Sequence, residues 1–294
     1  MKTLKLIQSD TYLRPYAEAI EGRYNYALKR EKELTGGKKL SEWANGYMYF
    51  GLHRVEGEES NVESRKLKVK SKWVLREWAP NATAIYMIGD FNNWQKDEAY
   101  RLQPIGNGVW EVVLEEDMIH HEQLYKLLVE WYGGKGERIP SYTNRVVQDP
   151  VTKLFAAQVW CSGVQEFRSS GVLISPEGSN DYSQANVQKC KKGFKRRKAS
   201  DPLFIYECHI GMSSEEEKVN SYEEFRIYIL PRIAKLGYNC LQIMAIQEHP
   251  YYGSFGYHVS NFFAVSSRCG TPEEVKRLID DAHAYGMDVI MDIV

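Results

Sequence analysis

The chain has 294 residues, of which 43% are hydrophobic and 26% are charged. Because single domains commonly hold about 100 to 200 residues, this length predicts two domains with separate cores. The formal net charge of −1 argues against nucleic acid or a membrane surface as a partner, because proteins that bind either one carry a basic field. No apolar run approaches the length of a signal peptide or the roughly 20 residues that span a bilayer. We therefore expect a cytoplasmic protein with a neutral, polar partner.

The cysteines give no sign of a disulfide framework or of a metal site. Five cysteines are an odd number and are widely spaced, without a CxxC pair: Cys161, Cys190, Cys208, Cys240 and Cys269. Neither Cys208 with His209 nor His120 with His121 is accompanied by further ligands at metal-binding spacing. We expect reduced structural thiols, no metal and no cofactor.

The first 60 residues are predicted to be a helical segment. Residues 14–34 are rich in Ala, Glu, Lys, Arg and Leu, which favour helices, and no proline follows Pro15. Gly36 and Gly37 come directly afterwards and are typical of a helix end.

Residues 61–160 predict an all-β, immunoglobulin-like sandwich. Short β-branched and aromatic runs (KWVLREW, TAIYMIGDF, GVWEVVL, QLYKLLVEWY) alternate with the turns GNG at residues 106–108 and GGKG at residues 133–136. Residues 161–200 follow without periodic pattern. They include KCKKGFKRRK, with seven basic residues in ten, which we interpret as a solvated linker because the chain as a whole lacks a basic field.

Residues 201–294 alternate strand and helix, which predicts parallel strands: LFIYECH, CLQIMAI and MDVIMDIV. Ser221 with Glu224 and Thr271 with Glu274 mark the starts of two helices, and Gly237 and Gly286 mark their ends. We expect Pro231 to kink the first helix. In the second, the buried stripe is expected to be Val275, Leu278, Ile279 and Ala282.

Two architectures use this alternation, the doubly wound dinucleotide-binding sheet and the TIM (β/α)8 barrel. The first strand is followed by CHIGMSSEEE and not by a glycine-rich phosphate loop, which favours the barrel. A complete barrel takes about 250 residues, so we expect here its first βαβαβ part, with each strand covered on both faces.

Segments along almost the whole chain resemble the glycogen and starch branching enzymes of eukaryotic type, in the alpha-amylase superfamily. They are YLRPY at 12–16, GYMYFGLHR at 46–54, REWAPNA at 76–82, GDFNNW at 89–94, YECHIG at 206–211 and LPRIAKLGYNCLQIMAIQEHPYYGSFGYHVSNFFA at 230–264, followed by GTPEEVKRLID and DVIMDIV. The resemblance implies an amino-terminal helical segment, a carbohydrate-binding module and a barrel that transfers α-1,4-glucan segments to a 6-hydroxyl. The implied partner is an α-1,4-glucan such as glycogen, starch or a malto-oligosaccharide.

In the barrel, the resemblance places Tyr257 against the sugar at the cleavage point, with packing in a phenylalanine-rich loop as the alternative. His258 is a second candidate for substrate contact. Asp292 matches an aspartate that braces the site without acting as nucleophile. Retaining transfer needs a nucleophile and an acid about 5 to 5.5 Å apart, and in the family both lie on later strands. No catalytic residue is therefore expected within this chain, and Glu207 and Glu248 are not assigned these roles.

In the sandwich, Trp94 of GDFNNW and Lys126 of LYKLL match a glucan-binding surface of starch-binding modules. A second candidate surface is the EWAP segment with Trp78, Ala79 and Pro80. Burial in the core is the alternative for both tryptophans. Tyr142, in RIPSY, stands where relatives tend to carry tryptophan, which leaves sugar contacts at that position uncertain.

Two other functions remain open: a glucan-binding module without catalysis, and a debranching enzyme of the same superfamily. The segment GYNCLQIMAIQEHPYYGSFGYH favours branching. The sequence does not distinguish glycogen from starch, nor does it give the transferred chain length or the oligomeric state.

Overall fold

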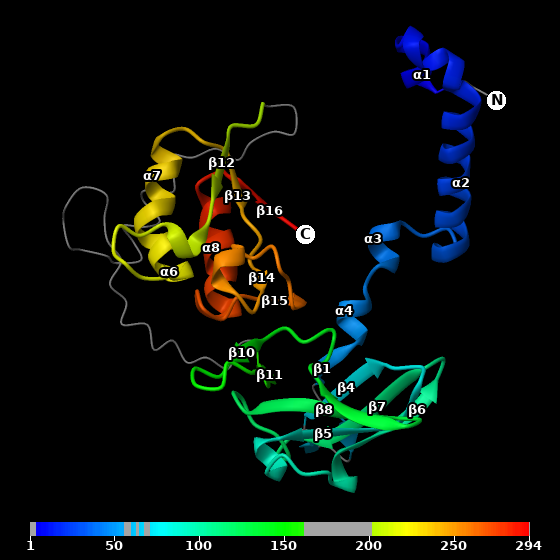
Figure 1. Cartoon of the computed structure of the whole chain (residues 1–294), viewed down its shortest axis with the longest axis vertical. Helices are drawn as coiled ribbons and strands as arrows, with labels where there is room; N and C mark the ends of the chain where they lie inside the picture. The colour runs from blue at the N-terminus through cyan, green and yellow to red at the C-terminus, as the bar shows by residue number, and fades with distance from the viewer. Residues whose placement is uncertain (1–3, 56–59, 63–64, 68–70, 162–201, 294) are drawn as a thin grey trace. The chain divides into compact units, whose positions relative to one another are not determined.

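The computed structural model describes residues 4–55, 60–62, 65–67, 71–161 and 202–293. The predicted linker with its basic run lies almost entirely outside these residues, as does Cys190. The chain divides into two units, Met1–Tyr49 and Phe50–Val294 (Figure 1). No helix in the described part is long and apolar enough to cross a bilayer.

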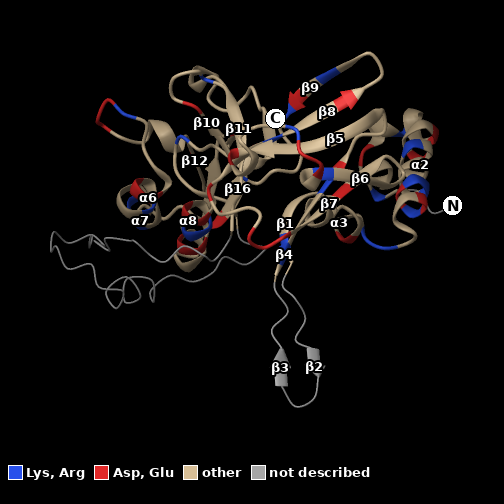
Figure 2. Cartoon of the chain, turned by 90° about the horizontal axis from the view of Figure 1, so that it is seen from below, with Lys and Arg blue, Asp and Glu red and all other residues tan. Residues whose placement is uncertain are grey.

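The first unit is helical, as predicted. It contains α1 (Lys5–Ser9), a 3-10 turn (Thr11–Tyr16), α2 (Ala17–Thr35), α3 (Leu40–Trp43) and α4 (Gly46–Tyr49). The long helix α2 begins slightly later than predicted because Pro15 lies in the 3-10 turn before it. It ends at Gly36, whose φ of 63° is the left-handed conformation that glycine adopts without strain. Basic Lys and Arg residues and acidic Glu residues are interspersed along α2 (Figure 2).

The second unit begins with an antiparallel β-structure. Its strands are β1 (Gly51–Val55), β4 (Lys72–Trp78), β5 (Ala82–Gly89), β6 (Arg101–Gly106), β7 (Val109–Glu115), β8 (Leu124–Trp131), β9 (Gly134–Arg138), β10 (Val146–Gln148) and β11 (Phe155–Gln158). They are paired in the order β1-β4-β7-β6-β5-β8-β11-β10, with β9 paired to β8. Strands β2 (Ser60–Val62) and β3 (Arg65–Leu67) form a separate pair.

Strand β6 joins the two layers of this sandwich. Its residues Arg101 and Leu102 pair with β5, whereas Gln103 to Gly106 pair with β7. Alternate side chains of both layers point inward and form one core, which includes Leu75, Ile85, Met87, Leu102, Leu114, Tyr125 and Leu127. The sandwich prediction is confirmed.

The sandwich starts earlier than the boundary that we placed at residue 60. Strand β1 begins at Gly51 and pairs with β4 through contacts such as Leu52 with Leu75. The sequence pattern did not reveal this strand, because its stability depends on pairing with a strand that is distant in the sequence. Local composition does not indicate such pairing.

The parallel strands are also confirmed. In the described residues, β12 (Ile205–Cys208), β13 (Cys240–Ile243) and β16 (Asp288–Met291) form a parallel sheet in the order β12-β13-β16. The connections contain α6 (Tyr222–Glu224), a π-helical turn (Phe225–Ile229), α7 (Leu230–Lys235) and α8 (Pro272–Ala284). The loop after β13 carries the antiparallel pair β14 (Gln247–Glu248) and β15 (Asn261–Val265).

Both helix starts carry the predicted capping boxes, Ser221 with Glu224 and Thr271 with Glu274. Pro231 is the second residue of α7, which begins where the π-helical turn ends. Proline has no N–H to donate and crowds the carbonyl one turn earlier, so the wider π turn relieves the conflict at this point.

The prediction that both faces of the parallel strands are covered is wrong for the described residues. The helical side is buried, with Phe225, Leu230, Leu241, Leu278 and Ala282 in one core. Ile205, Ile290 and Met291 remain exposed. The side chains that cover the buried face come from α6, the π-helical turn, α7 and α8.

The sandwich and the parallel part contact each other inside the second unit. Tyr142 stacks between Phe50, with ring centroids 5.2 Å apart, and Phe263, at 4.5 Å. Trp160 Nε1 donates to Glu273 Oε2 at 2.7 Å, and Arg145 donates to the carbonyl of Gly270. Tyr142 therefore packs at this junction.

Candidate functional site

The structure brings Tyr257 and Asp292 together. Tyr257 Oη donates to Asp292 Oδ2 at 2.9 Å, and this hydrogen bond raises the pKa of the tyrosine. The two residues come from the loop after β13 and from the end of β16, which is the carboxyl end of the strands where barrel enzymes place their sites. Tyr257 is 38% exposed, so its ring is available to a ligand and is not enclosed in the core.

The backbone before Tyr257 is fixed by a close approach. Gly256 has φ of 89°, and a Cβ at this position would lie 1.7 Å from the carbonyl oxygen of Ala245. Phe255 has φ of 55°, an uncommon conformation for an aromatic residue. The ring of His209 meets Phe255 edge to face at 5.6 Å and Tyr252 at 5.9 Å. The loop is thus held in one conformation by residues distant from it in the sequence.

His258 is not brought into this pair. Its side chain is exposed, and among the described residues no hydrogen bond to its ring is found. Its predicted contact with substrate stays a prediction.

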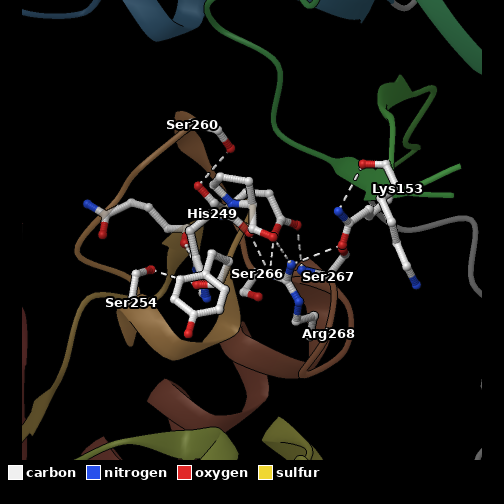
Figure 3. Close-up of polar contacts among 12 residues, drawn as sticks. Lys153, His249, Ser254, Ser260, Ser266, Ser267 and Arg268 are labelled. Carbon is white, nitrogen blue, oxygen red and sulfur yellow. Dashed lines mark hydrogen bonds and ion pairs between the residues drawn. The ribbon is translucent and has the colours of Figure 1, made fainter. Parts of the chain in front are cut away.

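Glu248 has a structural environment. Its side chain is fully buried (0% exposed). The carboxylate accepts hydrogen bonds from the Ser267 amide at 2.7 Å and the His249 amide at 3.1 Å, and it pairs with Arg268 at 3.4 Å. Figure 3 shows His249, Ser267 and Arg268 gathered around this cluster. The buried carboxylate of Glu248 therefore stabilises the loop that carries Tyr257.

Arg268 extends this cluster to the sandwich. It donates to the carbonyls of His249 and Pro250 and to Gln148 Oε1 at 3.0 Å. Arg145, which is buried nearby, has its pKa lowered by burial, while Glu248 and other carboxylates oppose the shift. These contacts were not predicted from the sequence, because nothing in the local pattern links residues so far apart.

In the sandwich, Trp94 and Lys126 also come together. Lys126 Nζ lies 6.0 Å from the centroid of the Trp94 ring, at the limit of a cation–π contact. The same ammonium pairs with Glu137 Oε2 at 2.9 Å. The half-buried ring and the ammonium offer a flat apolar face next to a hydrogen-bond donor.

The Trp94 ring is held by its own turn. Trp94 Nε1 donates to Asp90 Oδ1 at 3.0 Å, and Asp90 Oδ2 accepts from the Leu124 amide at 2.7 Å. Asn93 and Trp94 both have positive φ, at 53° and 60°. Such strain costs about 1–3 kcal/mol per residue and is concentrated at functional sites, so a binding role is a reasonable hypothesis for this turn.

Sequence reasoning missed Asp90 and Glu137. Asp90 lies inside GDFNNW, so inspection of that motif alone could have identified it. Glu137 is on β9, opposite Leu128 of β8, and its approach to Lys126 follows from the register of that hairpin. The β8–β9 hairpin carries both acidic and basic residues (Figure 2).

The EWAP segment forms a second surface. Trp78 is 58% exposed and donates from Nε1 to the Asn107 carbonyl at 3.1 Å, so its interpretation as a core residue is wrong. Pro80 packs against Gly108, where a Cβ would lie 2.8 Å from the proline Cβ. The Ala79 carbonyl accepts from Trp110 Nε1 at 3.0 Å. Glu77, just before, is buried and accepts from the Ser141 amide, and burial raises its pKa.

Metal-binding side chains are not clustered in the part of the chain that the structure describes: no group of three or more His, Cys, Asp or Glu residues there could hold a metal ion. Four cysteines of the described residues, Cys161, Cys208, Cys240 and Cys269, are not in a disulfide bond.

Two family profiles match the chain. Carbohydrate-binding module 48 (isoamylase N-terminal domain) matches residues 50–151, which include Trp78, Trp94 and Lys126. The alpha amylase catalytic domain matches residues 227–294, which include Tyr257 and Asp292.

Solved structures give the fold. The pullulanase SAP of group B Streptococcus has a TM-score of 0.56 at 18% identity, over 90% of this chain and 34% of that one. The pullulanase of Bacillus acidopullulyticus has a TM-score of 0.54 at 16% identity, over 83% of this chain and 29% of that one. At these identities the likeness concerns the fold alone.

Curated relatives are much more similar in sequence. The 1,4-alpha-glucan-branching enzyme of Aspergillus oryzae is 39% identical over 98% of this chain, and that of Dictyostelium discoideum is 36% identical over 99%. The chain spans 38% of the length of each of these relatives. The chain is thus homologous, over almost its whole length, to part of the enzymes named 1,4-alpha-glucan-branching enzyme, and it carries a carbohydrate-binding module 48 followed by part of an alpha amylase catalytic domain.

Proposed function

We propose that this chain serves 1,4-alpha-glucan branching, the transfer of an α-1,4-glucan segment to a 6-hydroxyl, and that its described residues supply glucan binding. The observation that carries the proposal is the pair of Trp94 and Lys126, with Nζ 6.0 Å from the ring centroid. The relatives named as branching enzymes support it, and one pullulanase of similar fold was solved in complex with maltotetraose. A reducing, cytoplasmic compartment is part of the same proposal and is supported by Cys161, Cys208 and Cys269, which carry reduced thiols.

The pair has the properties that a sugar site needs. A tryptophan ring covers the apolar face of a pyranose, and its edge remains polar. Lys126 and Glu137 place a donor and an acceptor next to that ring, which suits a hydroxyl group that can both accept and donate. Because Asp90 holds the ring through Nε1, little side-chain freedom is lost when a glucan binds, and affinity improves accordingly.

In the barrel part, we propose that Tyr257 forms a wall for the reacting sugar and that Asp292 orients it. The 2.9 Å hydrogen bond fixes the phenol, and a fixed wall favours the conformation that approaches the transition state. Replacement of Tyr257 by alanine in an active protein should therefore lower kcat strongly, while the free energy of unfolding should change little.

We also infer that residues 1–294 bind glucan without branching it. Retaining transfer requires two carboxyl groups about 5 to 5.5 Å apart, one of them a nucleophile. Among the described residues, Glu248 is enclosed and fully engaged, Asp292 is bound by Tyr257, and Glu207 accepts from Gln242 at 3.2 Å. Incubation of the purified chain with amylose should form no α-1,6 linkages by NMR of the anomeric protons. Branching above a control without protein would contradict this inference.

Calorimetric titration of the chain with maltoheptaose tests the binding site. Trp94→Ala should weaken binding at least about tenfold, which corresponds to roughly 1.4 kcal/mol of lost contact. Tyr132→Ala is a matched control, since this aromatic residue in the β8–β9 turn is almost fully exposed; it should leave affinity within about twofold. Unchanged affinity in folded Trp94→Ala would reject this site, and a loss in Trp78→Ala would place binding at the EWAP surface.

The competing functions differ in product. A debranching enzyme is the alternative left open by the sequence, and the relatives at 36–39% identity, which are named branching enzymes, do not favour it. In a protein that carries this chain with the remainder of an amylase-type barrel, branching would make α-1,6 linkages accumulate in amylose, whereas debranching would remove them from pullulan. A glucan-binding module alone would do neither.

A further inference from the structure

A small cavity lies behind the loop that carries Tyr257. Its volume is about 10 Å³, and its walls include His209, Ala245, His249, Tyr252 and Ser266. These residues come from the end of β12, the loop after β13 and the end of β15. Three segments that determine the position of the loop therefore meet at this cavity.

Three residues that line the cavity have buried polar atoms without a partner among the described residues. His249 Nε2, Ser266 Oγ and His209 Nδ1 are buried and form no hydrogen bond with any described residue. His249 and Ser266 are each only 3% exposed. Buried polar atoms are nearly always hydrogen-bonded, so three such atoms around one cavity indicate a ligand that can bond to all of them.

The protonation of His249 defines what this ligand must offer. Its Nδ1 lies 2.9 Å from the carbonyl oxygen of Gln247. A carbonyl only accepts, so Nδ1 carries the proton, and in the neutral ring Nε2 is an acceptor that needs a donor. Ser266 Oγ does not reach it within hydrogen-bond distance, and a gap between two such groups is commonly bridged by water.

We propose that this cavity is a binding site for one ordered water. A single water needs a cavity of at least about 10–15 Å³ and two to four polar partners, and both conditions are met here. One O–H of the water donates to His249 Nε2 and the other donates to His209 Nδ1. The hydroxyl of Ser266 donates to the water oxygen.

A metal ion fits the cavity less well. Cys269 also lines it, but burial raises the pKa of this thiol to about 12, so that it stays protonated and is a poor ligand. The described residues contain no group of three metal-binding side chains in a suitable arrangement.

The water has a structural consequence for the loop. It links the ends of β12, β14 and β15 through the side chains of His209, His249 and Ser266, which otherwise do not bond to one another. His209 also meets Tyr252 and Phe255 edge to face. The bound water therefore fixes the base of the loop from which Tyr257 projects, independently of which glucan the protein uses.

A crystal structure of residues 1–294 at a resolution that reveals ordered water tests the proposal, together with NMR of the histidine ring nitrogens. We expect one density peak within hydrogen-bond distance of His249 Nε2 and Ser266 Oγ. In solution, His249 Nδ1 should carry a proton, as its contact with the Gln247 carbonyl requires, and the ring protons of His249 should show a cross-peak to a long-lived water.

Two variants separate the site from its neighbourhood. Ser266→Val removes the hydroxyl and fills the cavity, so the density and the water cross-peak should both disappear. Ser267→Val, one residue along, is the matched control and should keep both signals. If Ser266→Val does not fold, Ser266→Ala should at least weaken the cross-peak.

The proposal is overturned by any of three results: a direct bond between His249 and Ser266, a cavity without density in the wild-type chain, or a peak with the anomalous signal of a metal. Persistence of the water cross-peak in folded Ser266→Val would also reject the assignment.

Discussion

The sandwich and the parallel part bury their cores in different ways. In the sandwich, two antiparallel layers enclose one core from both sides. In the parallel part, helices cover one face of β12, β13 and β16 while Ile290 and Met291 stay exposed. The parallel part also encloses the carboxylate of Glu248, and capping boxes mark the starts of its two helical segments.

The chain offers a direct way to measure this contrast. All seven tryptophans, from Trp43 to Trp160, precede the parallel part. Tryptophan fluorescence therefore follows mainly the sandwich and the amino-terminal unit, with Trp160 also sensing its contact with Glu273 of α8. Hydrogen exchange of amides in β13 and α8 follows the parallel part. A local change in one part should move one signal more than the other.

The largest effect is expected from Glu248→Ala. This substitution leaves Arg268 without its buried carboxylate and two amides without their acceptor, and removal of one partner from a buried ion pair costs about 3–5 kcal/mol. Amides of β13 and α8 should exchange correspondingly faster, with a smaller change in tryptophan fluorescence.

Glu216→Ala is the matched control for that loss. Glu216 pairs with Lys218 in an exposed position, where ion pairs contribute about 0–1 kcal/mol. If the two substitutions have equal effects, Glu248 does not stabilise the loop in the manner proposed.

A pair of leucine substitutions comes next in size. Leu75 of β4 and Leu278 of α8 are both fully buried, in the two different cores. Replacement by alanine should cost about 2–5 kcal/mol in each case. Urea titration should move the fluorescence transition for Leu75→Ala, and exchange of α8 amides should respond to Leu278→Ala. Equal responses of both probes to both variants would mean that the two cores unfold as one.

A smaller effect is expected from the capping box of α8. Thr271 Oγ1 accepts from the Glu274 amide at 3.3 Å, and Glu274 Oε2 accepts from the Thr271 amide at 2.7 Å. Loss of such a cap costs about 1 kcal/mol. A double-mutant cycle of Thr271→Ala and Glu274→Ala, read by exchange in the first turn of α8, should show coupling, because each side chain serves the other residue's backbone. Additive effects would indicate two independent contacts.

The features that were predictable from the sequence are those with local causes. The strands KWVLREW and GVWEVVL, the end of α2 at Gly36 and the caps at Ser221 and Thr271 all depend on residues a few positions apart. The resemblance also identified Tyr257, Asp292, Trp94 and Lys126, and the structure brings them together as two pairs.

Features with distant causes were not predictable. Pairing of β1 with β4, the approach of Glu137 to Lys126 and the burial of Glu248 under Arg268 depend on register and packing between remote segments. The exposed face of the parallel sheet was also missed, because an apolar strand sequence reports a tendency to be buried and does not identify what covers it.

The smallest expected effect, and the one most specific to the sandwich, is a pH dependence at Glu77. Burial raises the pKa of this carboxyl above its ordinary value of 4.5, against the opposing effect of the amides of Ser141 and Trp78. The folded chain therefore binds a proton at Glu77 at pH values where the unfolded chain has already released it. Since stability falls with pH wherever the folded state holds more protons, the contribution of Glu77 is greatest below pH 4.5 and declines as pH rises through the folded pKa.

Urea titrations followed by tryptophan fluorescence between pH 4 and 7 should show this decline as the difference between the wild-type chain and Glu77→Gln. The control Glu111→Gln, which removes a partly exposed ion pair with Arg76, should not reproduce it. A difference that grows in favour of the wild type as pH rises would mean that the amide hydrogen bonds outweigh burial at this site.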